Sequence, residues 1–236
     1  MIKRLAHLTD IHLDEDDTRR HGVDARRNWR ILLRDVEARG IEKIIFGGDI
    51  GESSAHDWFF ESLRRFELDL VLGNHDRCGE VGRSFRPPEQ PNPDELYYGY
   101  DDDHFRYLFL DSSSGAISDP QLGWLEQQLE TSRSLVLFVH HPILAVDAVV
   151  DRKYPLEGRE KVAGLLQRLG RRANVFCGHY HLADDRTLGS IEQSVTPAGC
   201  FQIAREEDPV AVDPTCFGYR ILTLREDRIT SQVVTL

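Results

Sequence analysis

The sequence contains few cysteines, and they lack the spacing of a structural zinc site or a disulfide framework. Only four occur in 236 residues, and none belongs to a Cys-x-x-Cys pair. Three of them, Cys177, Cys200 and Cys216, lie in apolar surroundings, which is typical of buried free thiols. We therefore expect free thiols rather than disulfides.

Long apolar segments are also missing. No stretch approaches the ~20 consecutive apolar residues that a membrane-spanning helix needs. The first residues, Met1 to Leu5, run into a predicted strand without an apolar leader or a small-residue cleavage site. We expect a cytoplasmic protein that has no membrane partner.

Basic clusters are absent as well. The chain has 40 acidic and 29 basic residues, which gives a formal net charge of −11. A charge of this sign repels polyanions at long range, so no long nucleic acid is expected as a partner. A small phosphate ester stays compatible with the charge, because bound metal ions would neutralise several of the acids.

What the sequence does contain is a series of short apolar runs separated by helical patterns. Runs such as 43–46 and 135–139 are apolar without alternation, which is typical of strands covered on both faces. Beyond residue 190, strands follow one another without obvious helices. This order favours an α/β fold with two packed mixed β-sheets flanked by helices, and the lack of a repeat or linker favours a single domain over residues 1–236.

The patterns give explicit expectations for the elements. Helices are predicted over residues 24–39 and 158–169 and from Ser118 onward, where glycines or a proline mark their ends. Residues 79–96 and 145–157 are predicted loops that shape the entrance to a site. Strands are predicted over residues 5–9, 43–46, 68–72, 105–110, 134–139, 173–177, 190–196, 199–204, 217–224 and 228–234.

A polar cluster at the carboxyl end of five of these strands is the most informative feature. Each cluster contains Asp, Asn or His, side chains that bind divalent metal ions. Because ligands gather beyond the carboxyl ends of strands in an open α/β sheet, the clusters are expected to converge. They are Asp10-Ile11-His12, Gly48-Asp49, Gly73-Asn74-His75-Asp76, His140-His141-Pro142 and Gly178-His179-Tyr180-His181.

Each cluster alone also has an ordinary structural interpretation. Asp10 is typical of a helix cap, Asp49 of a turn, and His140 of a hydrogen-bonded core histidine. His179 and His181 point the same way only if their segment is extended. All five structural interpretations would have to hold together, each at the end of a strand. A site for two metal ions, of the kind that hydrolyses phosphoesters, explains the set more simply.

The order of these motifs resembles that of the calcineurin-like metallophosphoesterases. Asp-x-His, Gly-Asp, Gly-Asn-His-Asp, His and Gly-His-x-His follow one another along the chain. The flanking segments LTDIHL (8–13), VHHP (139–142) and TPAGCFQ (196–202) are similar to the class III cyclic-nucleotide phosphodiesterases, the bacterial 3′,5′-cyclic AMP phosphodiesterase group. The resemblance spans about residues 5–224 and implies the four-layer αββα sandwich of that family.

Seven side chains are implied by this resemblance as ligands of two divalent metal ions. Oxygen and imidazole donors without thiolate suit Mn, Fe, Zn or Co. The family motif has its ligand at the first position of the fourth cluster, which favours His140 over His141. The implied arrangement has Asp49 bridging both ions, Asp10, His12 and His181 on the first ion, and Asn74, His140 and His179 on the second.

The mechanism suggested by this ligand set is attack on phosphorus by a hydroxide that bridges the two metals. His75 follows the ligand Asn74 and is the expected catalytic residue, which binds the phosphate or protonates the leaving group. Asp76 either supports catalysis by orienting His75 or a ligand histidine, or caps the following turn. Arg77 either binds the substrate phosphate or is a surface arginine.

We therefore expect a metal-dependent phosphodiesterase that acts on small phosphodiesters, and the resemblance suggests 3′,5′-cyclic nucleotides. The alternatives within the family are a phosphomonoesterase, a glycerophosphodiesterase and a nuclease. A non-catalytic binding protein on the same fold is the alternative from another class. The resemblance also allows a homodimer, with residues 217–234 offering an edge.

Overall fold

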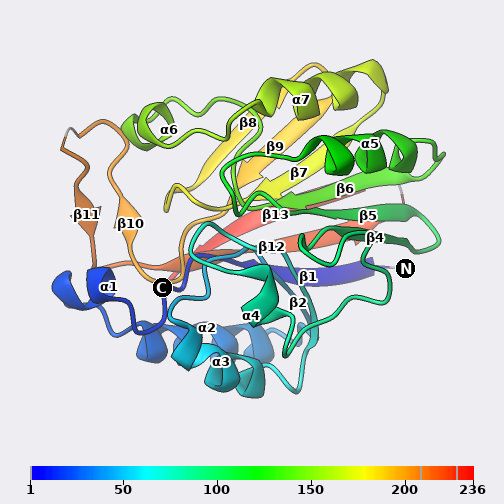
Figure 1. The fold of residues 1–236 in the computed structure, drawn as a ribbon. Helices are drawn as coiled ribbons and strands as arrows, with labels where there is room; N and C mark the ends of the chain where they lie inside the picture. Colours follow the sequence, from blue (N-terminus) through cyan, green and yellow to red (C-terminus); the bar gives the residue numbers. More distant parts are fainter. Residues whose placement is uncertain (1, 208, 227) are drawn as a thin grey trace.

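Two β-sheets pack face to face, and helices cover both outer faces (Figure 1). The computed structural model describes residues 2–207, 209–226 and 228–236. The five-stranded sheet has the order β13 (Arg228–Thr235), β12 (Gly218–Arg225), β1 (Ile2–Leu8), β2 (Lys43–Phe46) and β3 (Glu67–Leu70). The six-stranded sheet has the order β4 (Tyr98–Asp101), β5 (Phe105–Leu110), β6 (Ser134–Val139), β7 (Ala173–Cys177), β9 (Ile191–Val195) and β8 (Asp184–Leu188).

The helices lie in two separate outer layers. Helices α2 (Ala25–Ala38) and α3 (His56–Ser62) lie on the side of the five-stranded sheet. Helices α5 (Asp119–Gln128) and α7 (Arg159–Arg168) lie on the side of the six-stranded sheet. The predicted αββα sandwich of two mixed sheets is thus confirmed.

Strand direction decides where the polar clusters lie. β1, β2 and β3 are parallel to one another, and so are β5, β6, β7 and β9. Strands β12, β13, β4 and β8 run antiparallel to their neighbours. The carboxyl ends of the parallel strands therefore share one edge of each sheet, where ligands collect in such folds.

The inner faces of the two sheets pack through aromatic side chains. The His7 ring of β1 lies 5.5 Å from the Phe138 ring of β6 and 6.3 Å from the Phe176 ring of β7. The Tyr98 hydroxyl of β4 donates a hydrogen bond to the Leu70 carbonyl oxygen of β3. Burial of these rings and a buried polar contact fix one sheet against the other.

Helix α2 follows from its local sequence as predicted. The Asp24 side chain accepts a hydrogen bond from the Arg27 amide, which caps the first turn. Gly40 has a φ of 66°, which suits the left-handed residue after a helix. Trp29, fully buried, stacks on Phe59 of α3 at 5.1 Å, so the apolar stripe faces the core.

Several elements were not predicted from the sequence. Strand β8 is an edge strand whose residues are mostly exposed, so no apolar run marked it. The predicted strand 199–204 is reduced to a short hairpin with its partner, because only two residues pair on each side. Within the predicted strand 199–204 the observed strand is β10 (Gln202–Ile203). The other elements outside the predictions have few residues for a periodic pattern: α1 (Asp16–Arg20), η1 (Ser53–Ala55), α3, α4 (Cys78–Val81), β4, α6 (Val149–Lys153) and β11 (Val212–Asp213).

Within the described ranges, no helix has the length and apolar character needed to cross a membrane.

Candidate metal centre

All five polar clusters meet at the carboxyl edge of the two sheets. Three strands of the first sheet and two of the second each contribute the residues that follow them directly. The predicted ligands are Asp10 and His12 after β1, Asp49 after β2, Asn74 after β3, His140 after β6, and His179 and His181 after β7.

The backbone at these residues adopts a conformation that L-amino acids rarely adopt. Six non-glycine residues in the described part of the chain have positive φ, and five of them are predicted ligands. The sixth, Asp14, lies two residues after His12. Such strain persists only where surrounding contacts enforce it, and it concentrates at functional sites. The five ligands are Asp10, His12, Asp49, His179 and His181.

Backbone hydrogen bonds between loops hold these strained turns. The Asp10 amide donates to the Gly48 carbonyl oxygen at 2.9 Å, and the His12 amide donates to the Asp49 carbonyl oxygen at 3.1 Å. The Gly178 amide donates to the His140 carbonyl oxygen at 2.9 Å. The loops after β1 and β2, and those after β6 and β7, are therefore fixed pairwise.

The first donor group consists of two imidazoles and a carboxylate. The Nε2 atoms of His12 and His181 lie 3.1 Å apart, and His181 Nε2 lies 3.4 Å from Asp10 Oδ1. Atoms bound to one metal ion at ~2.0–2.2 Å lie roughly 3–3.5 Å from one another. The spacing of these donors fits a shared ion.

Asp49 lies between this group and a second one. Its Oδ2 atom is 3.6 Å from His12 Nε2 and 3.2 Å from His140 Nε2. Asp49, His140 and His179 each offer a donor atom within 4.8 Å of the others, and so do Asp10, His12 and Asp49. One carboxylate therefore joins two sets of donors, as expected for a bridging ligand.

The ring of His140 provides the clearest test of whether a cation fits. Its Nδ1 donates a hydrogen bond of 2.7 Å to the Gly47 carbonyl oxygen, which can only accept. Its Nε2 is buried and has no hydrogen-bond partner among the described residues, although it faces the Asp49 carboxylate. Because Nδ1 already carries one proton of the ring, Nε2 must either carry the second or bind a metal ion. The donor atoms around Nε2 suit a metal ion.

The electrostatics of the site also favour positive charge. Asp10 and Asp49 are buried, with 0% and 2% of their surface exposed. Burial raises the pKa of Asp49, but the charge and the hydrogen bond of His140 and the charge of His12 together outweigh it and hold that pKa well below its usual range. Burial lowers the pKa of His140, yet Asp49 and Asp10 raise it to about 10. Two buried carboxylates whose oxygen atoms lie within 4.8 Å of each other need cationic partners.

Asn74 and His179 are the two remaining predicted ligands of the second group. Both line a cavity of about 420 Å³ together with His12 and His181. The Tyr154 carbonyl oxygen lies 3.1 Å from His179 Nε2. The 145–157 segment, which contains α6, therefore borders the site as predicted.

His141 lies beside the centre rather than against Asp49. Its Nδ1 is 2.9 Å from the Ser112 hydroxyl, and its ring centroid is 4.0 Å from that of His179. Burial, with the charges of His179 and His140, lowers the pKa of His141 to about 2. Of the two neighbouring histidines, His140 is the one that the geometry brings to Asp49.

Asp76 contacts backbone amides. Its Oδ2 accepts hydrogen bonds from the Asp49 and Gly73 amides at 2.7 and 2.9 Å, and its Oδ1 accepts one from the Ile50 amide at 2.9 Å. These amides belong to the loop of Asp49 and to a residue three positions before Asp76, so the contacts match neither the predicted orientation of His75 nor a cap of the following turn. Asp76 supports the site indirectly, because it holds the turn that carries Asp49.

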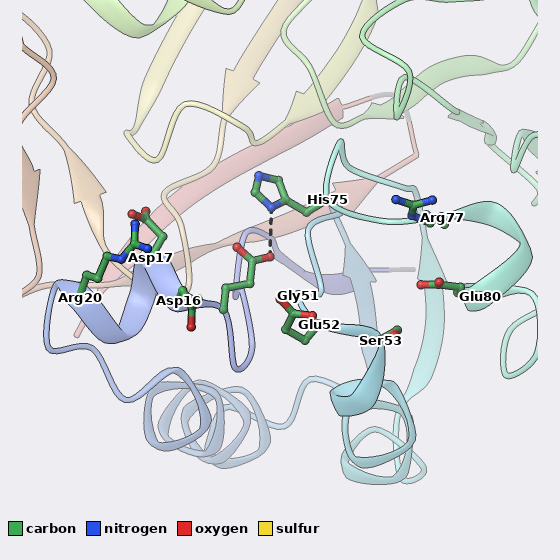
Figure 2. Close-up of a pocket in the computed structure, with 10 residues that line it drawn as sticks. Asp16, Asp17, Arg20, Gly51, Glu52, Ser53, His75, Arg77 and Glu80 are labelled. Atoms are coloured by element: carbon green, nitrogen blue, oxygen red, sulfur yellow. Dashed lines mark ion pairs between the residues drawn. The ribbon is translucent and has the colours of Figure 1, made fainter.

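His75 and Arg77 lie on the open side of the centre. The His75 amide donates to Asp49 Oδ1 at 2.8 Å, while the His75 side chain is 44% exposed. Both residues line a second cavity of about 560 Å³ (Figure 2). His75 is thus next to the donors and accessible from outside, and Arg77 is exposed at the same cavity.

Glu15 is a site residue that the sequence interpretation missed. Its carboxylate lies 3.0 Å from His12 Nδ1 and 3.1 Å from His75 Nδ1. Burial raises its pKa, but the hydrogen bonds from His12 and His75 outweigh burial and lower it to about 2. The only signal was its position three residues after His12 in an acidic run, where exposed acids are common.

Gly178 provides a test of how tightly the loops meet. A Cβ at this position would overlap Thr9 Oγ1 and Asp10 Oδ2. We expect Gly178→Ala to displace Asp10, to destabilise the fold by ~1–3 kcal/mol and to weaken metal binding. Thermal melting and elemental analysis measure both effects.

Gly79→Ala is the matched control, because a Cβ there would meet nothing within 4 Å. Equal melting temperature and metal content in the two variants would contradict the close approach of the loops.

Comparison with known proteins agrees with this geometry. The model of the calcineurin-like phosphoesterase superfamily domain matches residues 4–213. A probable cyclic nucleotide phosphodiesterase of Fibrobacter succinogenes is 26% identical over 86% of this chain and 82% of its own length. A cAMP/cGMP dual specificity phosphodiesterase of Mycobacterium tuberculosis is 32% identical over 84% of this chain and 67% of its own length. A glycerophosphodiester phosphodiesterase of Enterobacter lignolyticus is 26% identical over 75% of this chain and 70% of its own length.

Solved structures show the same fold. The purple acid phosphatase of yellow lupin superposes with a TM-score of 0.71 at 16% identity, and the alignment covers 99% of this chain. The chain spans about half the length of the lupin protein (51%). A dimetal phosphatase of Danio rerio gives a TM-score of 0.61 at 13% identity and is covered over 98% of its length. The chain belongs to the calcineurin-like phosphoesterase superfamily, whose members are metal-dependent phosphoric ester hydrolases with a dinuclear divalent metal centre.

Proposed function

We propose that this protein is a phosphodiesterase that hydrolyses small phosphodiesters, with 3′,5′-cyclic nucleotides as the favoured substrates. The observation that carries the proposal is the position of Asp49 Oδ2, at 3.6 Å from His12 Nε2 and 3.2 Å from His140 Nε2. A carboxylate between two donor groups is the arrangement that a pair of divalent ions requires. The names of the Fibrobacter and Mycobacterium relatives support the choice of substrate.

Seven residues would hold the two ions, and Mn, Fe, Zn and Co all suit their donors. Such a pair supplies a nucleophile at neutral pH and neutralises charge on the phosphate. Under this proposal Asp49 contacts both ions, Asp10, His12 and His181 contact one, and Asn74, His140 and His179 contact the other.

The remaining residues of the site act on the substrate. His75 stands beside the donors without belonging to either group, so we assign it to phosphate binding and protonation of the leaving group. The cavity of about 420 Å³ has an apolar wall that includes Phe201, Ile203 and Val212. Its volume suits a small ligand, and the apolar wall would receive a nucleobase.

A glycerophosphodiester is the second candidate substrate, because the Enterobacter relative is named for that activity. Both candidates share the diester and differ in the ester group. A homodimer, a cytoplasmic location and a single domain over residues 1–236 stay predictions.

A panel of four substrates tests the proposal: 3′,5′-cyclic AMP, a glycerophosphodiester, bis-p-nitrophenyl phosphate and p-nitrophenyl phosphate. We expect kcat/KM to be higher for the diesters than for the monoester, and higher for cyclic AMP than for the glycerophosphodiester. Preference for the monoester would contradict the phosphodiesterase assignment. Metal-loaded protein without turnover on any of the four would support a non-catalytic role instead.

A further inference from the structure

Glu15 connects a metal-ligand histidine to the accessible histidine of the site. Its Oε2 atom lies 3.0 Å from His12 Nδ1, and its Oε1 atom lies 3.1 Å from His75 Nδ1. Figure 2 shows the second contact as a dashed line that ends on His75. The two rings meet edge to face, with centroids 4.7 Å apart and planes at 90°. One carboxylate therefore fixes two imidazoles that also contact each other.

The position of this carboxylate is itself fixed. Glu15 precedes α1, and the Thr18 hydroxyl donates a hydrogen bond of 2.7 Å to the Glu15 carbonyl oxygen. The Glu15 side chain is 11% exposed, in contrast to 44% for His75. The Glu15 side chain is already restricted by burial and by the hydrogen bond to its backbone. It therefore loses little conformational entropy when it binds and orients the more exposed His75 ring.

Both contacts are made by Nδ1 atoms, which determines the tautomer of each ring and leaves Nε2 as the free nitrogen. An ionised carboxylate only accepts hydrogen bonds, so each Nδ1 must carry a proton. His12 then directs Nε2 at Asp49 and His181, as a metal ligand must. His75 likewise has Nε2 left over for the substrate.

The geometry points to Glu15 as a positioning residue that fixes the tautomer and orientation of His75 relative to the metal centre. This inference deepens the proposed function and rests on it, because it assumes that His75 serves the leaving group. Through Glu15, the placement of His75 also depends on the placement of His12. A misplaced His75 would slow the step in which the leaving group departs more than it weakens binding of the phosphodiester.

Other acids line the same cavity. Glu52 and Glu80 border the cavity of about 560 Å³ together with His75 (Figure 2). The Nδ1 atom of the His75 ring lies 3.1 Å from Oε1 of Glu15. Glu52→Gln is therefore the competing variant, and Glu80→Gln is the matched control with the same change from acid to amide.

The kinetic test compares Glu15→Gln with these variants at saturating zinc. We expect Glu15→Gln to lower kcat for 3′,5′-cyclic AMP by ~10–100-fold, the usual effect of losing an outer partner of a ligand histidine. KM should change little, and bis-p-nitrophenyl phosphate, whose leaving group needs no proton, should lose much less. In a His75→Ala background, Glu15→Gln should lower kcat by a smaller factor than it does in the unaltered protein, because the two residues act together.

A second readout does not depend on turnover. In zinc-loaded protein, ¹⁵N NMR of the histidine rings, with His75 assigned by its loss in His75→Ala, reports the tautomer. We expect the Nδ1–H form of His75 in the unaltered protein and a mixture of tautomers in Glu15→Gln. Elemental analysis should still give two zinc ions per chain in both.

Two results would overturn the inference. The first is an Nε2–H tautomer of His75 in the unaltered protein, which stands even if Glu15→Gln fails to fold. The second is a decrease in kcat for 3′,5′-cyclic AMP in Glu52→Gln that Glu15→Gln does not show. If the unaltered protein bound no zinc pair or hydrolysed no phosphodiester, the proposed function would fail instead, so the two failures are distinguishable.

Discussion

Asp49→Ala is expected to release metal from both positions and to abolish phosphodiesterase activity. The Asp49 carboxylate lies between His12 and His140, so its removal takes a donor from both groups at once. The loss of several kcal/mol of charge stabilisation in the transition state corresponds to at least ~10³-fold in kcat/KM. A substitution at one of the other ligands should affect mainly its own position.

Elemental analysis and the rate on bis-p-nitrophenyl phosphate measure this effect. Asp103→Ala is the control, since Asp103 is exposed and lies just before β5, at the opposite end of the strand from the site. We expect it to retain full metal content and activity. An Asp49→Ala protein that kept both ions and most of its activity would remove Asp49 from the bridging position.

His75→Ala is expected to lower kcat on a diester with a poor leaving group by ~10²–10⁴-fold, as loss of a general acid does. The His75 ring is accessible, and it belongs to neither donor group that includes Asp49. Metal content should therefore stay unchanged. The loss on bis-p-nitrophenyl phosphate should be smaller, because p-nitrophenolate leaves without a proton.

The measurement is kcat for cyclic AMP and for bis-p-nitrophenyl phosphate in the same preparation, with metal content determined alongside. Arg77→Ala is a useful comparison, because Arg77 lines the same cavity as His75 and is exposed. Equal losses of His75→Ala on both substrates would reject protonation of the leaving group and leave phosphate binding as its role.

The convergence of the ligands could be predicted from the sequence because it depends on strand direction. Buried strands such as β2 and β6 are apolar without alternation, which favours parallel pairing. Parallel strands end on the same side, so the residues after them meet. His140 and His179 are nearly 40 positions apart in the sequence, yet their rings lie 5.1 Å apart.

Contacts of single side chains could not be predicted in the same way. Glu15 follows Asp14 in an acidic run, and only the turn after β1 brings its carboxylate to His12 and His75. Asp76 follows His75 directly, but its hydrogen bonds go to backbone amides of the neighbouring loop. Pattern and propensity do not contain such loop geometry, because it depends on contacts between distant segments.

Two edge strands, β4 and β8, were hidden for a different reason, whereas the edge strands β3 and β13 were predicted. Strand β8 has mostly exposed residues, and β4 contains Gly99 and ends at Asp101. A strand with one neighbour buries little surface, so its sequence is free to be polar. All strands at the centre of each sheet were predicted, because burial there restricts the residue types.

Anomalous diffraction from a crystal soaked in manganese would locate the metal ions themselves. We expect two manganese peaks ~3.5–4 Å apart, with the Asp49 carboxylate between them and His12 and His140 on opposite sides. A single peak, or two peaks of which neither touches Asp49, would contradict this expectation.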